Sequence, residues 1–186
     1  MTKSGYDRRH VRIMTRLFIG TLLILGTASP PARADDACGP LFTVERNVNA
    51  NVVVYEAVHG ADGRLDPKKP VRAFWLMKAE DGRELGLNFF ERIRAYGVEA
   101  TGSPEPNVYS LKLRAFPDRS VILRKRGSCA EVVTRIEGKN AVLTRVFVSA
   151  TKKGLFPSVD FVYMFGTDPE TGFPVTERID TRGRTR

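Results

Sequence analysis

The stretch from Leu41 to Glu80 constrains the fold most strongly, because its apolar runs have the length of β-strands and are separated by turn-forming residues. It reads LFTVERNVNANVVVYEAVHGADGRLDPKKPVRAFWLMKAE. Residues 41–46 and 51–58 flank an Asn-rich turn and therefore predict a β-hairpin, since Asn tolerates left-handed backbone angles. A loop at 60–70, rich in Gly, Asp and Pro, leads to a third strand at 71–79. This strand is apolar on both faces, which predicts a central position in a sheet.

The next segment follows a helical period. Asn88 is suited to an N-cap, and Glu91 stands three residues later in the capping-box position. Apolar residues then recur at helical spacing until Gly97, a residue typical of helix ends. We expect one short helix over 88–97 that covers an open edge or end of the sheet. The contacts expected of this helix are burial of Phe90 and Ile93 and an approach of Tyr96 to Trp75.

From residue 107 onward the apolar residues alternate with polar ones, as in half-buried strands. Brief polar segments predict turns between these strands. The expected strands are 107–115, 121–126, 130–136, 141–149, 159–165 and 175–179, and the expected turns are 117–119, 126–128, 137–140 and 168–174. The pattern indicates an all-β fold, an antiparallel meander that forms a barrel or sandwich with one short covering helix.

The first 34 residues have the order of a secretory signal peptide. Four arginines within residues 8–16 precede an apolar run at 17–25, and Ala32-Arg33-Ala34 forms a small-residue cleavage site. The alternative is a membrane anchor, but the run is about half of the roughly 20 residues that a span needs. The sequence thus predicts a periplasmic or secreted protein without a stable membrane span after cleavage, by the general secretory or the twin-arginine route. The exported chain then comprises an arm at 35–40, a single β-rich domain at 41–179 and a basic tail at 180–186.

The charge of the chain belongs largely to its ends. The formal net charge is +9, and residues 1–34 contribute +5 of it through six basic residues and one acidic residue, which leaves +4. A nucleic-acid-binding protein is expected to concentrate basic residues on one face with interleaved aromatics. The sequence shows no such concentration, and we expect no nucleic-acid partner.

The two cysteines, Cys38 and Cys129, predict a disulfide, because an exported protein folds in an oxidising compartment and a single pair has one possible connectivity. The alternative is a pair of free thiols. If the bond forms, it ties the N-terminal arm to a strand some 90 positions downstream.

No catalytic or metal-binding motif is found in the sequence. The expected mature chain has one histidine, His59, and lacks HxH, HExxH, G-x-S-x-G and phosphate-binding glycine motifs. We therefore expect no metal and no cofactor. A pair of carboxylates for hydrolysis remains open if acidic side chains converge in three dimensions. The acidic residues considered for this role are Glu56, Glu80, Glu91 and Asp160.

The candidate binding site is a polar cluster around the strand that contains the only tryptophan. Arginine and tyrosine side chains beside a tryptophan are suited to orienting a polar or aromatic ligand. The predicted members are Arg72, Trp75, Glu91, Tyr96 and Arg114. The alternative is a tryptophan that fills the core while the arginines lie on the solvated face, which is the more common role of large aromatic residues.

Several short motifs occur in a characteristic order. These are N-V-N-A-N-V-V-V-Y-E-A, D-P-x-x-P-V-x-A-x-W, L-N-x-x-E, A-Y-G and L-R-A-F-P. In this order they resemble the bacterial domain-of-unknown-function 4833 family over about residues 41–179. The residues that carry the resemblance are Asn47, Asn49, Asn51, Tyr55, Glu56, Pro70, Trp75, Asn88, Glu91, Tyr96, Gly97 and Arg114. The resemblance implies an exported bacterial domain and carries no activity or catalytic residue.

Two functions are compatible with these patterns. The first is a non-enzymatic module that binds a small polar ligand or serves as an accessory of the cell envelope. The second is a hydrolase-type enzyme that acts on a small or carbohydrate substrate through convergent Glu/Asp and Arg residues. A cleft with titratable groups of displaced pKa would indicate the enzyme, whereas a pocket or exposed apolar patch would indicate the binding module.

Overall fold

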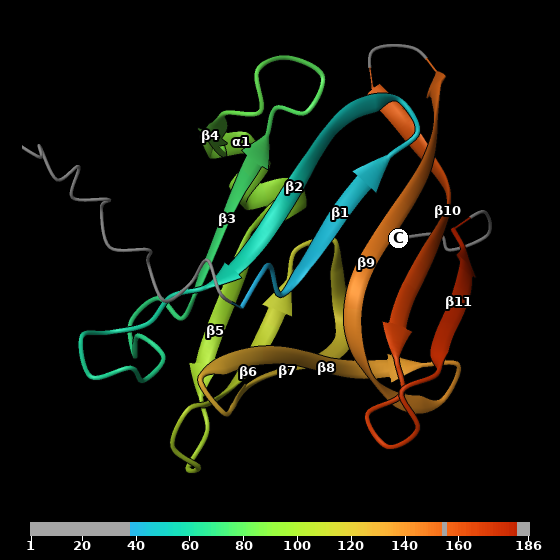
Figure 1. Cartoon of the computed structure of the whole chain (residues 1–186). Coiled ribbons are helices and arrows are strands. Elements are labelled where there is room, and N and C mark those ends of the chain that lie inside the picture. Colours follow the sequence, from blue (N-terminus) through green and yellow to red (C-terminus); the bar gives the residue numbers. More distant parts are fainter. Residues whose placement is uncertain (1–37, 154–155, 182–186) are drawn as a thin grey trace, which may run out of the picture. The chain divides into compact units, whose positions relative to one another are not determined.

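The computed structural model describes residues 38–153 and 156–181, which form a mixed, largely antiparallel sheet curled into a half-barrel (Figure 1). The predicted all-β class is therefore confirmed. The strands are β1 (Phe42–Arg46), β2 (Asn49–Ala57), β3 (Val71–Leu76), β4 (Glu84–Gly86), β5 (Val98–Gly102), β6 (Val108–Leu113), β7 (Phe116–Arg126), β8 (Cys129–Ile136), β9 (Lys139–Lys153), β10 (Phe156–Thr167) and β11 (Pro174–Asp180). The helix consists of α1 (Phe89–Glu91) and a π-helical turn, η2 (Arg92–Tyr96).

The strand order is β4-β3-β2-β1-β9-β8-β7-β6-β5, and β10 pairs with β9 and with β11. The long strand β9 pairs with β8 through residues 139–142 and with β1 through residues 145–148. The pairing of β1 with β9 is parallel, so the sheet is not the purely antiparallel meander that the sequence predicts. The reason is that β1 and β9 are about 100 residues apart, and no hairpin turn fixes their relative direction.

The predicted hairpin of β1 and β2 is confirmed, and β3 pairs antiparallel to β2 as expected. The predicted turn at 117–119 is wrong, because these residues lie inside β7 and the chain reverses at 114–115. Pro117 stands where the ladder between β6 and β7 is interrupted, between the pairs Leu113↔Phe116 and Leu111↔Val121. A proline is tolerated there because it need not donate a ladder hydrogen bond.

The central position predicted for β3 is also wrong. The three-residue strand β4 pairs with β3 and ends the sheet, so β3 is the second strand from the edge. Sequence patterning missed β4 and β5 because both are short and mostly exposed. The two faces of β3 are nevertheless both partly buried: Trp75 lies in the main core, whereas Phe74 packs with Val52 and Val54 on the opposite face.

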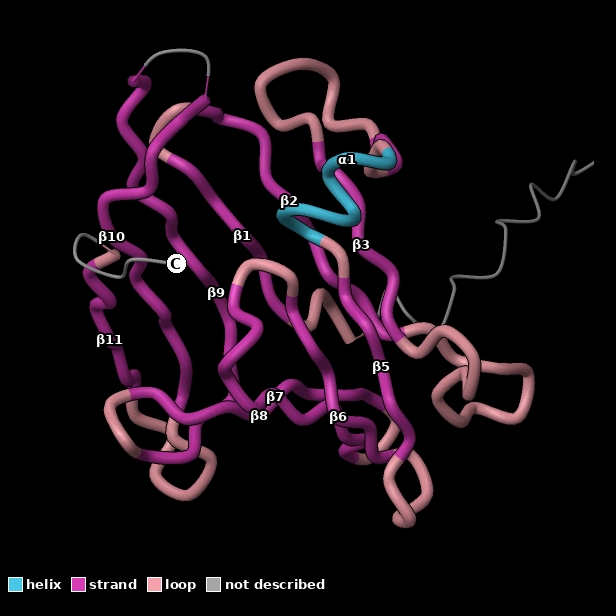
Figure 2. The backbone as a smooth tube through the Cα atoms, turned by 180° about the vertical axis from the view of Figure 1, so that it is seen from behind, coloured by secondary structure: helices cyan, strands magenta, loops and turns pink. Residues whose placement is uncertain are grey.

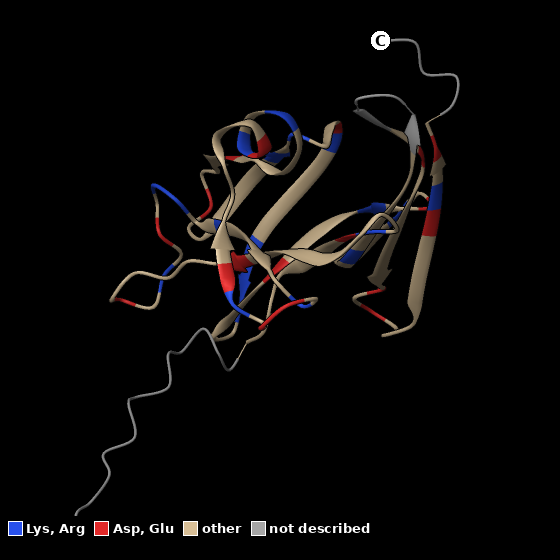
Figure 3. Ribbon diagram, turned by 90° about the horizontal axis from the view of Figure 1, so that it is seen from above, with Lys and Arg blue, Asp and Glu red and all other residues tan. Residues whose placement is uncertain are grey.

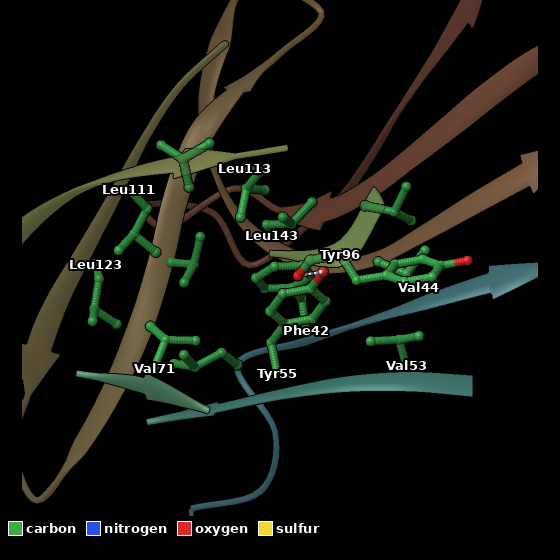
Figure 4. Packing of buried hydrophobic residues seen from close by; sticks show 14 of the residues in the cluster. Phe42, Val44, Val53, Tyr55, Val71, Tyr96, Leu111, Leu113, Leu123 and Leu143 are labelled. Atoms are coloured by element: carbon green, nitrogen blue, oxygen red, sulfur yellow. Dashed lines mark hydrogen bonds between the residues drawn. The ribbon is translucent and has the colours of Figure 1, made fainter. Parts of the chain in front are cut away.

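The main core fills the concave side of the curled sheet with apolar side chains from most strands (Figure 4). The ring of Phe42 stacks on that of Tyr55, with 4.2 Å between centroids. The buried Tyr55 hydroxyl donates a hydrogen bond of 2.8 Å to the carbonyl of Tyr96, which links β2 to the end of the helix. Burial raises the pKa of Tyr55 well above its usual value. A neutral hydroxyl in this position is therefore a permanent donor.

The predicted helix is confirmed, and it connects β4 to β5, the two terminal strands of the sheet order (Figure 2). The predicted face of this helix is wrong. Phe90 is 69% exposed and Ile93 is 43% exposed, whereas Tyr96 is buried. The helix faces the core through Tyr96, with Glu91 and Ala95 partly buried, so the remaining apolar residues point outward.

The predicted disulfide between Cys38 and Cys129 is present, with 5.4 Å between the Cα atoms. It ties the N-terminal arm to the first residue of β8. The predicted signal peptide and residues 182–186 of the tail lie outside the described residues. Within the described part, no helix has the length and apolar character required to cross a membrane.

Candidate functional site

Three of the five predicted site residues lie together where the helix packs on β3. The indole Nε1 of Trp75 donates a hydrogen bond of 3.1 Å to Oε1 of Glu91. The Tyr96 ring meets the Trp75 ring edge to face, with centroids 5.3 Å apart. The predicted approach of Tyr96 to Trp75 is thus confirmed, and β3 and the helix each contribute to one cluster.

The helix position is fixed by the predicted capping box. The side chain of Asn88 accepts a hydrogen bond of 2.9 Å from the backbone N–H of Glu91, and Oε2 of Glu91 accepts one of 2.8 Å from the backbone N–H of Asn88. Both carboxylate oxygens of Glu91 therefore have protein donors, one from the cap and one from the indole. Because these bonds satisfy orphan N–H groups of the first turn, they hold the helix start in a defined place.

A residue that sequence analysis missed completes the cluster. The guanidinium carbon of Arg46 lies 5.2 Å from the ring centroid of Trp75 and 5.4 Å from that of Tyr96. Arg46 is half-buried at the end of β1, and its Nε is buried without a hydrogen-bond partner in the described part of the chain. None of the ion pairs formed by the described residues includes Arg46. We call Arg46, Trp75, Glu91 and Tyr96 the Arg46 cluster.

The charges of this cluster act on Tyr96. Burial raises the pKa of its hydroxyl, the positive charge of Arg46 works in the opposite direction, and the negative charge of Glu91 adds to the increase. The pKa of Tyr96 is therefore above its ordinary value. At neutral pH the cluster contains the Arg46 cation, two aromatic rings, a neutral hydroxyl and the Glu91 carboxylate, whose oxygens accept from Trp75 and Asn88.

The family of the chain follows from a comparison with family models. The model described as Domain of unknown function (DUF4833) matches residues 42–178. The chain belongs to the DUF4833 family. The comparisons with curated proteins and with solved structures gave no match.

The other two predicted site residues of this DUF4833 domain lie elsewhere. Arg72 projects from the opposite face of β3, where its guanidinium carbon is 4.2 Å from the Phe74 ring centroid. It forms ion pairs of 2.6 Å with Glu56 and 2.7 Å with Glu84. The reason is the two-residue period of the strand, which puts Arg72 and Trp75 on different faces.

Arg114 follows β6 directly and forms an ion pair with Glu99 of β5. Its backbone N–H donates a 3.0 Å hydrogen bond to the carbonyl of Gly97, just beyond the helix. Neither Arg72 nor Arg114 bonds to Glu91, whose partners are Trp75 and Asn88. The sequence correctly predicted that these elements adjoin. It did not predict that Arg72 and Arg114 point away from the face that carries Trp75.

The candidate carboxylates of this DUF4833 domain have separate partners. Glu56 pairs with Arg72, and Glu80 pairs with Arg83 at 3.1 Å. Asp160 bonds to Thr151 across β9 and β10. In the described chain no three His, Cys, Asp or Glu side chains are grouped so that they could hold a metal ion. Basic and acidic residues are interspersed over the strands and loops (Figure 3).

Sequence analysis did not find the ion pairs of Glu131, the most buried ion-paired carboxylate among the described residues. The carboxylate of Glu131 on β8 is 8% exposed and bonds to Arg124 at 2.6 Å and Arg126 at 2.9 Å. Burial raises its pKa, but the hydrogen bonds from Arg126 and Arg124 outweigh this effect and the pKa is lowered. Glu131 is therefore a structural carboxylate that stays ionised. The only signal for this contact in the sequence is the alternating pattern of β7 and β8, whose register pairs Arg124 with Glu131.

Proposed function

We propose that this DUF4833 domain is an exported, non-enzymatic ligand-binding module that holds a small organic carboxylate at Arg46. The observation that carries the proposal is the buried, unpartnered Nε of Arg46 between the rings of Trp75 and Tyr96. A partly desolvated cation that forms no ion pair is unfavourable, and a bound carboxylate would supply a paired charge and hydrogen-bond acceptors. Guanidinium groups bind carboxylates through two parallel hydrogen bonds, which favours this class of anion.

The aromatic rings support the same ligand class. A cation that stacks against aromatic faces keeps its edge N–H groups available for an anion. Trp75 and Tyr96 are each only 6% exposed, so they hold the guanidinium of Arg46 from the core side and orient it toward a ligand. Glu91 is not ion-paired with Arg46 in the described part of the chain, and its oxygens accept hydrogen bonds from Trp75 and Asn88 instead.

The remaining carboxylates favour binding over the hydrolytic alternative. A general acid needs a carboxyl group with a raised pKa. Wherever a carboxyl pKa is displaced in the described residues, it is lowered, and the groups concerned are Asp66, Glu131, Asp168 and Glu177. Such groups remain ionised and serve as hydrogen-bond acceptors and partners of arginine.

Export to the periplasm or the exterior is part of the proposal. The disulfide supports it, because disulfides persist in oxidising compartments. N-terminal sequencing of protein recovered after export is expected to begin at Asp35. An intact Met1 in a membrane fraction would contradict the cleavage.

The binding proposal is tested through the single tryptophan, since Trp75 lies in the cluster and its emission reports directly on the site. Acetate, succinate and benzoate are titrated into the wild type, with calorimetry as a second readout. At least one of them is expected to give saturable binding, and Arg46→Met is expected to abolish it. Arg145→Met is the matched control, because Arg145 also stacks on a ring, that of Phe165 at 3.9 Å, but already pairs with Glu45.

Two results would overturn the proposal. One is the absence of saturable binding to the wild type for all three anions. The other is undiminished binding to Arg46→Met with a melting temperature like that of the wild type. Loss of binding in Arg145→Met, with binding kept in Arg46→Met, would place the anion near Arg145 and away from Arg46.

A further inference from the structure

The helix carries an exposed apolar surface that ligand binding at Arg46 does not explain. Phe89 and Phe90 are each 69% exposed, and Ile93 is 43% exposed. The two phenyl rings lie edge to face with centroids 5.7 Å apart. We call Phe89, Phe90 and Ile93 the helix tip. An exposed apolar patch on a protein surface is often an interaction site, whereas single exposed apolar residues are common and need no explanation.

The helix tip is held rigidly. The capping box fixes the first turn, and the Glu91 carboxylate is bound to Trp75 of β3 at 3.1 Å. Nε of Arg92 donates a 3.0 Å hydrogen bond to the carbonyl of Leu87, a buried residue just before the helix. The exposed phenyl groups are therefore presented on a fixed turn, which lowers the entropic cost of docking.

The exposed charged side chains of the helix are basic. Arg92 and Arg94 are exposed on either side of Ile93, and neither forms an ion pair with a described residue. The acidic residues that precede the helix form ion pairs in which two arginines are shared, Arg83 by Glu80 and Asp81, and Arg72 by Glu84 and Glu56. Arg83 pairs with Glu80 at 3.1 Å and Asp81 at 3.6 Å, and Arg72 pairs with Glu84 at 2.7 Å.

The size of the tip argues against a second copy of the chain as its partner. Three side chains at these exposures offer roughly 300–400 Å² of apolar surface, since an aromatic side chain presents about 150–250 Å². A stable dimer interface buries about 1,200–2,000 Å² in total. Two such tips fall well short of that area. A lipid interface needs no complementary protein surface, and paired phenyl groups beside arginines are typical of interfacial anchors.

We propose that the helix tip docks this domain on the surface of an anionic phospholipid bilayer. Phe89, Phe90 and Ile93 enter the interface between headgroups and acyl chains, while Arg92 and Arg94 bind the phosphate groups. This docking does not depend on the carboxylate site, because it uses the outward face of the helix and Arg46 lies on the inward side.

The test is co-sedimentation with vesicles. Protein expressed from the full chain and purified in one processed form is mixed with vesicles of phosphatidylcholine, with or without phosphatidylglycerol. The wild type is expected to bind the phosphatidylglycerol vesicles, and the double variant Phe89→Ser/Phe90→Ser is expected to lose at least tenfold in partitioning. Arg92→Gln and Arg94→Gln are each expected to weaken binding about fivefold, in a salt-dependent way.

Phe173→Ser is the matched control, since Phe173 is 71% exposed but lies in the turn between β10 and β11. It is expected to bind vesicles like the wild type, as is Arg46→Met. Circular dichroism reports that each variant is folded. The proposal would be overturned if the wild type did not bind the anionic vesicles. It would also be overturned if Phe89→Ser/Phe90→Ser bound them as strongly as the wild type. So would a wild-type dimer that the double variant dissociates, which would make a second copy the partner.

Discussion

Trp75 on β3 and Glu91 in the helix are joined by a hydrogen bond of 3.1 Å from the indole N–H to one carboxylate oxygen. The other oxygen of the same carboxylate closes the capping box with the backbone of Asn88. One side chain thus fixes the start of the helix and its attachment to the sheet. Through these two bonds Glu91 also orients the rings beside Arg46 and keeps the helix tip on the outward side of the helix.

Replacing Glu91 by Gln separates these two bonds. In the position of Glu91, a glutamine directs its carbonyl oxygen to one of the two donors, the Asn88 N–H or the Trp75 indole, and its NH2 group to the other, so one of the two hydrogen bonds is lost. We expect the unfolding free energy to fall by about 1–3 kcal/mol, the cost of leaving one partly buried donor unpaired. Chemical denaturation followed by Trp75 emission measures the loss. Glu80→Gln, which alters an exposed ion pair with Arg83, should change stability by less than about 1 kcal/mol.

An unchanged unfolding free energy in Glu91→Gln would contradict this prediction. It would mean that the indole bond contributes nothing and that a cap of Asn88 and Gln is sufficient. The Trp75 emission maximum of the folded variant gives a second readout, because loss of the indole bond alters the polarity around the ring.

Gly97, which ends the helix, is predicted to tolerate no side chain. Its φ is −64°, so alanine would suit the backbone and would ordinarily stabilise by about 0.4–1 kcal/mol. A Cβ at this position would instead lie 1.8 Å from the carbonyl oxygen of Arg92. Because that atom is backbone, we expect Gly97→Ala to cost on the order of 3 kcal/mol. Thermal and chemical denaturation measure the loss.

Gly86→Ala is the control for this glycine. Nothing lies within 4 Å of a Cβ built at Gly86 in β4, so its replacement should be neutral or slightly stabilising. Equal effects of the two substitutions would contradict the close approach at Gly97.

The local patterns of the sequence predicted more than the long-range contacts. Asn88 and Glu91 predicted the helix start because capping is a short-range property. The same segment did not show which face meets the sheet, since Phe89, Phe90 and Ile93 have the spacing of a core face. That choice is made by Trp75 and Tyr55, which bind Glu91 and the Tyr96 carbonyl from distant strands.

The Arg46 cluster was predictable in part. Trp75, Glu91 and Tyr96 were expected to adjoin because β3 and the helix were recognised. The alternation of Phe42, Val44 and Arg46 along β1 was the one signal that could have put an arginine on the inner face. An arginine that points inward departs from the apolar pattern of a core strand. Functional sites are expected at positions that depart from such a pattern. The parallel pairing of β1 with β9 had no local signal at all.

The disulfide is predicted to stabilise the fold substantially. Cys38 and Cys129 are 91 positions apart, and cross-linking so long a loop restricts the unfolded chain. We expect reduction, or the double variant Cys38→Ala/Cys129→Ala, to lower the unfolding free energy by about 2–5 kcal/mol. Urea denaturation with and without reductant measures it. The double variant should show no response to reductant, and an equal stability of oxidised and reduced wild type would contradict the prediction.

Acid is predicted to weaken the fold through Glu131. The folded-state pKa of this carboxyl lies below its ordinary value of 4.5, because hydrogen bonds from Arg126 and Arg124 outweigh the opposing effect of burial. A group with a depressed folded pKa stabilises the protein fully above its ordinary pKa. That contribution is lost as the pH falls from about 4.5 through the lower, folded-state value. Stability should therefore decline over this acidic range.

Glu131→Gln tests the sign of this dependence. At neutral pH the variant should be less stable by about 1–2 kcal/mol, a value reduced from that of a fully buried pair because Arg124 and Arg126 are 46% and 66% exposed. Its deficit should then shrink as the pH falls, since the wild type loses the same interaction on protonation. Urea unfolding at a series of pH values measures both curves. The unfolding free energy of Glu105→Gln, which alters an exposed carboxylate, should follow the pH dependence of the wild type over the whole range. A deficit of Glu131→Gln that is constant with pH would show that packing around residue 131, and not the ionised pair, determines its contribution.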